Sequence, residues 1–216
     1  MREPALIFDF GNVVGYFDHG RAYESLAAKL GLEAELLKRR ARAQGALELF
    51  REFECGRINP FDFAQQIMRI AGFNLPYEDF VQGWADIFWP DETVVALVPR
   101  LKARGYRMIL GSNTNILHAT HYRRQFAETL THFDRLIFSY EVGCMKPDRR
   151  FYLACVEAAG VPAESCVFID DAEENVQGAL RAGLRALAYT DTEVLLAGLR
   201  DMGVEVDTEM KETRER

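Results

Sequence analysis

The stretch Ala5-Leu6-Ile7-Phe8-Asp9-Phe10-Gly11-Asn12, near the start of the chain, decides the fold. Its apolar run, residues 5–8, is too short for a core helix and ends in an aspartate and a glycine-containing segment, which favours a buried strand followed by a loop. In an α/β protein, functional side chains usually gather at the carboxyl ends of parallel strands. We therefore expect Asp9 to lie at the functional edge of a parallel sheet.

Apolar runs of the same kind recur along the chain, and stretches with helical spacing separate them. Residues 94–101 repeat at helical spacing and stop at Gly105, and residues 151–159 do so before Gly160. This alternation of strand and helix predicts an α/β fold with a doubly wound, Rossmann-like parallel sheet. The further predicted strands are 106–110, 136–138, 166–169 and 184–189.

Residues 18–89 interrupt the alternation with several helical patterns in succession. We expect a small all-helical cap domain, inserted after the first strand and placed to cover the carboxyl end of that strand as a lid. The core domain would then comprise residues 1–17 and 90–206, with a flexible tail at 207–216. The helical patterns of the insertion cover 23–30, 36–50, 61–70 and 77–88.

The composition argues against several classes of function. Acidic residues outnumber basic ones by 33 to 26, and the net charge of −7 argues against nucleic acid or an anionic membrane as the main partner. No apolar run approaches the roughly 18 residues of a membrane span, and we expect no secretory signal. The cysteines show no spacing typical of a metal site, as expected of intracellular thiols. We therefore expect a cytoplasmic protein that binds a small molecule; the choice between monomer and homodimer stays open.

Three later strand ends also carry polar residues: Ser112-Asn113, Lys146-Pro147 and Asp170-Asp171. A carboxylate that attacks a phosphoryl group needs a cation and hydrogen-bond donors to neutralise the phosphoryl oxygens. Mg²⁺ suits this task, because it binds through one or two carboxylates together with phosphate. Taken alone, a residue of this kind is more often a helix cap or a loop residue than a catalytic one. The prediction of phosphoryl transfer through an aspartyl phosphate therefore depends on the four sites converging.

At these residues the chain resembles the haloacid dehalogenase superfamily of hydrolases, over nearly its whole length. The helical insertion looks like the cap domain of this family. The motifs look closest to those of small sugar-phosphate phosphatases and of the phosphatase domain of soluble epoxide hydrolase. The four ordered motifs are Phe8-Asp9-Phe10-Gly11-Asn12-Val13-Val14, Leu110-Gly111-Ser112-Asn113-Thr114-Asn115, Gly143-Cys144-Met145-Lys146-Pro147, and Phe168-Ile169-Asp170-Asp171 with Asn175.

The resemblance implies catalytic and phosphate-binding roles for four residues. Asp9 would be the nucleophile. Ser112 and Asn113 would hold the oxygens of the transferring phosphoryl group. Lys146 would neutralise both the phosphoryl group and the nucleophile.

The resemblance also implies a Mg²⁺ site. Asp9 and Asp171 would be its carboxylate ligands, and the main-chain carbonyl of Gly11 would be the third protein ligand. Asp170 and Asn175 would orient the metal and the lysine.

Gly11 departs from the family pattern, which has an aspartate here that protonates the leaving group and then activates water. Glycine keeps the carbonyl for the metal but loses proton transfer, typically an effect of about 10²- to 10⁴-fold. Activity would survive with a good leaving group, such as an acyl or anomeric phosphate, or if another group delivers the proton. Asp18 is the nearest acidic residue in sequence, but we interpret it as a loop or hinge residue.

Other residues carry weaker signals. His118 and His121 lack a third ligand, so we expect them at the surface or partly buried rather than at a metal site. The aromatic residues of the insertion are expected mostly to build its small core, with one or two facing the substrate. They are Phe50, Phe53, Phe61, Phe63, Phe80, Trp84, Phe88 and Trp89.

The main hypothesis is a Mg²⁺-dependent phosphatase of a small phosphorylated metabolite such as a sugar phosphate. One alternative is a 2-haloacid dehalogenase, which also uses an attacking aspartate and lacks the second aspartate of the first motif. The adjacent carboxylates Asp170 and Asp171 argue against a metal-free reaction on an anionic haloacid. The other alternative is a phosphate-binding or regulatory protein whose turnover is reduced because of Gly11.

Overall fold

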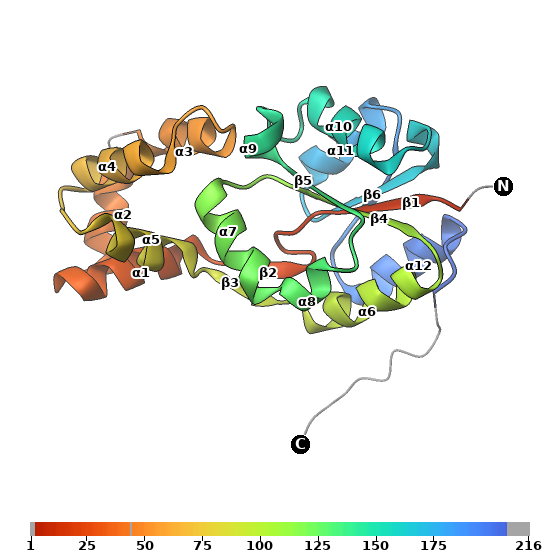
Figure 1. Ribbon diagram of the computed structural model, residues 1–216, viewed down its shortest axis with the longest axis horizontal. Coiled ribbons are helices and arrows are strands. Elements are labelled where there is room, and N and C mark those ends of the chain that lie inside the picture. Colours follow the sequence, from red (N-terminus) through yellow and green to blue (C-terminus); the bar gives the residue numbers. More distant parts are fainter. Residues whose placement is uncertain (1–2, 44, 207–216) are drawn as a thin grey trace, which may run out of the picture.

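The structure is a computed structural model that describes residues 3–43 and 45–206, so the expected tail at 207–216 lies outside it. Within the described residues, five parallel strands form a sheet in the order β5-β4-β1-β6-β7 (Figure 1). The chain winds from the central β1 to one side and then to the other, which confirms the predicted doubly wound fold. The strands are β1 (Ala5–Phe8), β4 (Arg107–Ser112), β5 (Arg135–Phe138), β6 (Cys166–Asp170) and β7 (Arg185–Ala188).

Helices cover both faces of the sheet (Figure 1). Successive side chains of β1 point to opposite faces, so Leu6 and Phe8 join one hydrophobic core while Ala5 and Ile7 join the other. No helix in the described part of the chain is both long and apolar enough to cross a membrane. The core helices are α6 (Glu92–Ala103), α7 (Ile116–Gln125), α8 (Ala127–Leu130), α9 (Ser139–Val142), α10 (Arg149–Ala159), α11 (Glu173–Arg181) and α12 (Thr192–Asp201), with a 3₁₀ turn at Ala163–Ser165.

The helical cap confirms the prediction of an insertion after β1, while the exact bounds 18–89 stay a prediction. The two chain connections between cap and core lie side by side, because β2 (Gly15–Phe17) pairs antiparallel with β3 (Phe88–Pro90). The cap helices are α1 (His19–Leu30), α2 (Ala34–Ala43), α3 (Ala46–Glu54), α4 (Pro60–Ala71) and α5 (Tyr77–Ala85).

Two predicted helical stretches of the cap are wrong in their extent. The pattern over 36–50 is divided between α2 and α3, because Gly45 adopts the left-handed conformation (φ 78°). The pattern over 77–88 ends at Ala85, because Phe88 pairs with Phe17 in the two-stranded sheet.

The cap touches the core near the carboxyl edge of the sheet. Gly56, just after α3, lies so close to the main chain of Tyr140 in α9 that a Cβ atom would collide with the Tyr140 carbonyl oxygen. Figure 1 shows α3 beside α9 at this point. A larger side chain at position 56 would therefore force the cap away from the core.

Candidate active site

The register of the parallel strands places the predicted site residues side by side at the carboxyl edge of the sheet. Phe8 pairs with Ile169, and the main-chain N–H of Asp9 donates to the Ile169 carbonyl at 2.8 Å, so Asp9 lies beside Asp170. On the other side of β1, strand β4 ends at Ser112. The carboxyl ends of β1, β4 and β6 thus meet as the sequence predicts.

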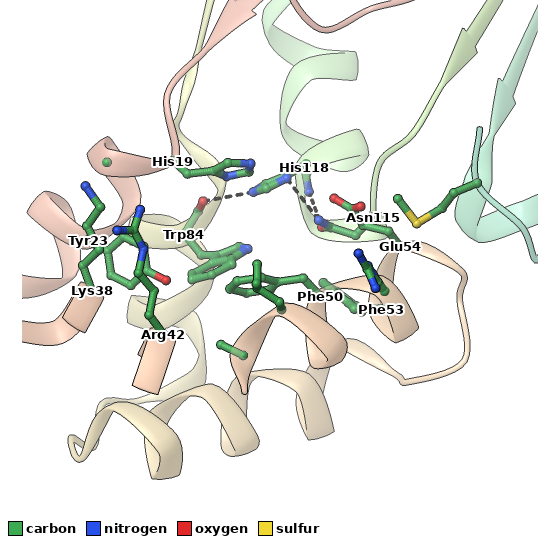
Figure 2. Close-up of a pocket in the computed structure, with 15 residues that line it drawn as sticks. His19, Tyr23, Lys38, Arg42, Phe50, Phe53, Glu54, Trp84, Asn115 and His118 are labelled. Atoms are coloured by element: carbon green, nitrogen blue, oxygen red, sulfur yellow. Dashed lines mark hydrogen bonds between the residues drawn. The ribbon is translucent and has the colours of Figure 1, made fainter. Parts of the chain in front are cut away.

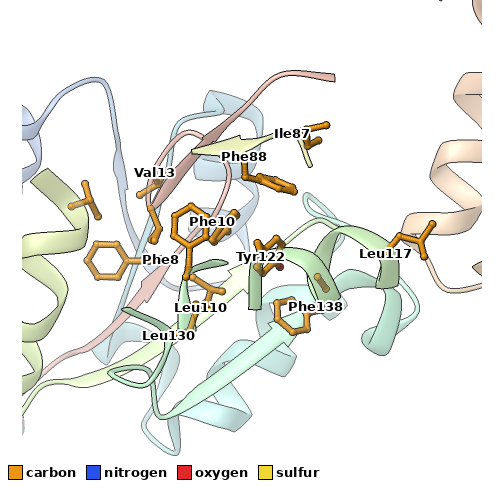
Figure 3. Packing of buried hydrophobic residues seen from close by; sticks show 14 of the residues in the cluster. Phe8, Phe10, Val13, Ile87, Phe88, Leu110, Leu117, Tyr122, Leu130 and Phe138 are labelled. Atoms are coloured by element: carbon orange, nitrogen blue, oxygen red, sulfur yellow. The ribbon is translucent and has the colours of Figure 1, made fainter. Parts of the chain in front are cut away.

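The loop that follows Asp9 is held in one shape by local hydrogen bonds and by packing. The Phe10 carbonyl accepts hydrogen bonds from the main-chain N–H groups of Val13, Val14 and Gly15, at 3.4, 3.0 and 2.9 Å. Asn12 adopts φ 55°, a left-handed conformation that asparagine tolerates better than most residues. The Phe10 ring stacks on Tyr122 with centroids 4.0 Å apart (Figure 3). The buried aromatic anchor and the tight turn fix the position of Asp9.

Lys146 bridges two buried carboxylates. Its Nζ lies 2.8 Å from Oδ1 of Asp9 and 2.6 Å from Oδ2 of Asp170. The side chain of Asn113 clamps the loop that carries this lysine, since Oδ1 of Asn113 accepts from the Lys146 N–H at 2.8 Å and Nδ2 donates to the Lys146 carbonyl at 3.1 Å. The ammonium group is therefore placed by contacts on both its side chain and its main chain.

Burial and the neighbouring charges shift the pKa values of both Asp9 and Lys146. Burial raises the pKa of the Asp9 carboxyl to about 7, although the Lys146 ammonium opposes the shift. Burial alone would lower the pKa of Lys146, but the carboxylates of Asp9 and Asp170 outweigh it and raise that pKa. The lysine thus stays charged, while the Asp9 carboxylate needs further positive charge to be fully ionised.

The acidic groups next to Lys146 fit a divalent cation. Oxygens of Asp9, Asp170 and Asp171 lie within 4.8 Å of one another. Asp170 is already engaged, because its Oδ1 accepts from Asn175 Nδ2 and from the Ala172 N–H, both at 2.9 Å. Asp171 is exposed. One ammonium group offsets only one of the three carboxylates, and hard oxygen donors are the ligands that Mg²⁺ prefers.

The structure brings the predicted site residues into one region, and in it the side chain of Asn113 is engaged with another part of the site. Its amide side chain binds the main chain of Lys146 through Oδ1 and one N–H of Nδ2, so a contact with phosphate could come from its main-chain N–H or from the second N–H of Nδ2. Ser112 is buried at the end of β4 and, with Gly11 and Asn113, lines a cavity of about 60 Å³. Asp18, interpreted from the sequence as a loop or hinge residue, is exposed and caps helix α1 by accepting from the Gly20 N–H at 2.7 Å.

A second cavity, of about 370 Å³, lies between the cap and the core and shares His19, Glu54 and His118 with the smaller one. Figure 2 shows Glu54 and Asn115 at one end and Tyr23, Lys38 and Arg42 at the other. Phe50, Phe53 and Trp84 add aromatic surface, which is one residue more than the one or two expected from the sequence. The site thus has a small end, where Gly11, Ser112 and Asn113 lie, and a larger, mostly apolar end under the cap.

The position expected for His118 is wrong, because the cap helix α5 covers it. His118 is buried (4% exposed); its Nδ1 accepts from Asn115 Nδ2 at 3.1 Å and its Nε2 donates to the Trp84 carbonyl at 3.3 Å. Burial lowers the pKa of His118 to about 3, so its imidazole is neutral. His121 is partly exposed, as expected.

Sequence reasoning missed Trp84 and Glu54 as individual site residues. The Trp84 side chain is buried against His118, and its Nε1 has no hydrogen-bond partner among the described residues. Burial raises the pKa of the Glu54 carboxyl to about 7. Neither residue belongs to a motif, and only the long-range contact of cap and core places them here.

Comparison with known proteins agrees with this geometry. The family model of haloacid dehalogenase-like hydrolases matches residues 5–183. The chain is 30% identical over 204 residues to Phosphatase MT3486 of Mycobacterium tuberculosis, covering 86% of this chain and 87% of that protein. It is 25% identical over 178 residues to D-ribitol-5-phosphate phosphatase of Bacteroides thetaiotaomicron, covering 79% of this chain and 84% of that protein. A crystal structure of a HAD family enzyme from the same organism, in complex with magnesium and inorganic phosphate, matches with a TM-score of 0.73, 25% identity and coverage of 88% and 95% of the two chains.

Proposed function

The chain belongs to the haloacid dehalogenase-like hydrolase family, and we propose that it is a Mg²⁺-dependent phosphatase that hydrolyses a small phosphorylated metabolite through an aspartyl phosphate on Asp9. The observation that carries this proposal is the Lys146 ammonium between Asp9 and Asp170, with Asp171 nearby. A cation beside a buried carboxylate lowers the repulsion that an anionic phosphoryl group meets there.

Each predicted residue has a role in this proposal. Asp9 attacks phosphorus, and Lys146 neutralises the nucleophile and one phosphoryl oxygen. The hydroxyl of Ser112 and the main-chain N–H of Asn113 donate to the other phosphoryl oxygens. Mg²⁺, held by Asp9, Asp171 and the Gly11 carbonyl, would supply the remaining positive charge.

Asp170 and Asn175 support this arrangement from behind. Asp170 fixes the Lys146 ammonium at 2.6 Å, and Asn175 fixes Asp170 at 2.9 Å. These contacts keep the lysine in place while the phosphoryl group is transferred, since a fixed charge needs no reorganisation during the reaction.

The cavity of about 370 Å³ would hold the organic part of the substrate. Its aromatic surface favours a group with an apolar face, and the buried Trp84 Nε1 offers a hydrogen bond to an oxygen of that group. Lys38 and Arg42 add positive charge at the far end. The relative named D-ribitol-5-phosphate phosphatase makes sugar and sugar-alcohol phosphates the first class to test.

The test is a screen for Mg²⁺-dependent phosphate release from sugar phosphates, nucleotides and acyl phosphates, with the Asp9→Asn protein beside the wild type. We expect release that EDTA and Asp9→Asn both abolish. Release of halide from 2-chloropropionate without metal would instead favour a dehalogenase. Binding of beryllium fluoride without turnover of any phosphate ester would favour a binding or regulatory protein.

A further inference from the structure

Gly11 leaves the proton donor of the proposed reaction unassigned. We propose that Glu54, at the end of cap helix α3, protonates the leaving oxygen and then accepts a proton from the attacking water. This inference depends on the proposed phosphatase function. It makes the cap a supplier of a catalytic residue as well as a lid.

The position of Glu54 between the two cavities is the first observation that supports it. Glu54 lines the small cavity together with Gly11 and Ser112, next to the proposed site of the phosphoryl group. It also lines the large cavity, which would hold the organic group. The oxygen between phosphorus and that organic group must lie where the two cavities meet, and a proton donor has to reach that oxygen.

The surroundings of Gly11 are the second observation. A Cβ atom at this position would lie 2.8 Å from Cε1 of Phe17, so the Phe17 ring occupies the space that an aspartate would need. Phe17 belongs to β2, which leads into the cap. The chain has therefore filled the usual place of the acid with an aromatic ring, and the acid has to come from another element.

Other candidate donors near the two cavities fit less well. Both ring nitrogens of His118 are engaged, and its pKa of about 3 leaves no proton to give at neutral pH. Desolvation also lowers the pKa of His19 from its ordinary value, which disfavours its protonated form. The carboxylate of Asp18 caps α1 at an exposed position. Glu54 is the acidic side chain that lines both cavities.

The protonation state of Glu54 agrees with a double role. Burial raises the pKa of its carboxyl to about 7, so that near neutrality it can both give and accept a proton. The titratable groups around the large cavity are His19 and His118, both mostly neutral, and Tyr23; its cations are Lys38, Arg42 and Arg51. Burial is the cause of the raised pKa of Glu54, and Lys38 and Arg42 lie at the opposite end of the cavity.

The contact of cap and core holds Glu54 in place. Glu54 is the last residue of α3, and Gly56, two positions later, packs against the main chain of Tyr140. Opening of the cap would withdraw the carboxyl from the site. Proton transfer would therefore occur only in the closed form, when the organic group is enclosed.

The two chemical steps balance. In the first, a carboxylate oxygen of Asp9 bonds to phosphorus, the bond from phosphorus to the leaving oxygen breaks, and the Glu54 carboxyl gives that oxygen its proton. In the second, water bonds to phosphorus and loses a proton to the Glu54 carboxylate, while the bond from Asp9 to phosphorus breaks. Asp9 and protonated Glu54 are restored, and phosphate and an alcohol are released.

The leaving group provides a selective test. Release of p-nitrophenolate needs little protonation, whereas release of a sugar alkoxide needs a proton donor. The experiment measures the first-turnover rate of Glu54→Gln with p-nitrophenyl phosphate and with a sugar phosphate that the wild type hydrolyses, both with Mg²⁺. Glu48→Gln, on the same helix but exposed, is the matched control.

We expect Glu54→Gln to slow the first turnover of the sugar phosphate by about 100-fold or more and that of p-nitrophenyl phosphate by less than about threefold. With p-nitrophenyl phosphate, the variant should also release one equivalent of p-nitrophenolate per enzyme in a rapid burst. The reason is that hydrolysis of the aspartyl phosphate, which needs activation of water by Glu54, is slowed. Equal losses with both substrates, or no loss with either, would overturn the inference. Failure of the proposed function would appear instead as an inactive wild type, or as unchanged activity in Asp9→Asn.

Discussion

Nζ of Lys146 lies 2.8 Å from Oδ1 of Asp9, and both side chains are almost completely buried. Burial of a charged group is costly unless a partner compensates it. This pair therefore links the stability of the fold to the chemistry of the site.

Replacement of Lys146 by methionine should destabilise the metal-free protein. Lys146→Met leaves the carboxylates of Asp9 and Asp170 buried without their cation, and breaking such an ion pair costs about 3–5 kcal/mol. Urea unfolding at about pH 8 with EDTA measures the loss in free energy of unfolding. Lys102→Met is the control, because the pair of Lys102 with Asp134 is more exposed, and its loss should stay below about 1 kcal/mol. Equal losses would contradict the role of burial.

Replacement of Glu54 by glutamine should stabilise the protein at high pH. Burial raises the pKa of Glu54 from 4.5 to about 7, so the folded state binds more protons than the unfolded state between these values, and stability falls as pH rises. Glu54→Gln cannot ionise, so its stability does not fall for this reason as pH rises. The free energy of unfolding of the variant should equal that of the wild type at about pH 4 and exceed it by about 1–2 kcal/mol at pH 8. This figure is reduced because the side chain is partly exposed. A difference in stability that does not change with pH would show that Glu54 has an ordinary pKa.

Magnesium should stabilise the wild type through Asp171. A ligand that binds only the folded state adds about 2.7 kcal/mol at 100 times its dissociation constant. Thermal unfolding with and without Mg²⁺ measures the effect, which we expect Asp171→Asn to reduce strongly, along with activity. Glu174→Gln, in the first turn of the neighbouring α11, should respond to Mg²⁺ like the wild type. An unchanged response in Asp171→Asn would place the metal elsewhere.

Replacement of Trp84 by phenylalanine should weaken substrate binding without disturbing the phosphate end. The variant keeps an aromatic ring next to His118 but loses the buried Nε1 donor. Loss of one hydrogen bond corresponds to an increase in KM of about two- to tenfold for the true substrate. Inhibition by inorganic phosphate should stay unchanged. Trp89→Phe, at an exposed tryptophan outside the cavity, should leave KM unchanged; equal effects of the two variants would contradict a contact with substrate.

The sequence predicts the core fold well because local signals suffice for it. The apolar run 5–8 coincides with β1, and the ends of the other short apolar runs lie within a residue or two of the ends of β4, β5, β6 and β7. The strands β2 and β3 are only three residues long, and their pairing depends on Phe17 and Phe88 meeting across the whole cap. Such a long-range pairing leaves no periodic pattern in the sequence.

The motif residues of the site could be predicted because strand ends in a parallel sheet converge. Lys146, Asp170 and Asp9 meet as expected. The cap residues could not be predicted, since Glu54 reaches the site only through the packing of α3 against α9. The burial of His118 likewise depends on α5, whose Trp84 lies 34 residues before His118 in the chain.

The most direct test of the central claim is detection of the phosphorylated enzyme. The wild type is mixed with Mg²⁺ and p-nitrophenyl phosphate, quenched in acid during turnover, and examined for a hydroxylamine-labile phosphate on the peptide that contains Asp9. We predict that this acyl phosphate forms in the wild type, and that Asp9→Asn yields neither the acyl phosphate nor free phosphate. Phosphate release that persists in Asp9→Asn, without any acyl phosphate in the wild type, would contradict the account.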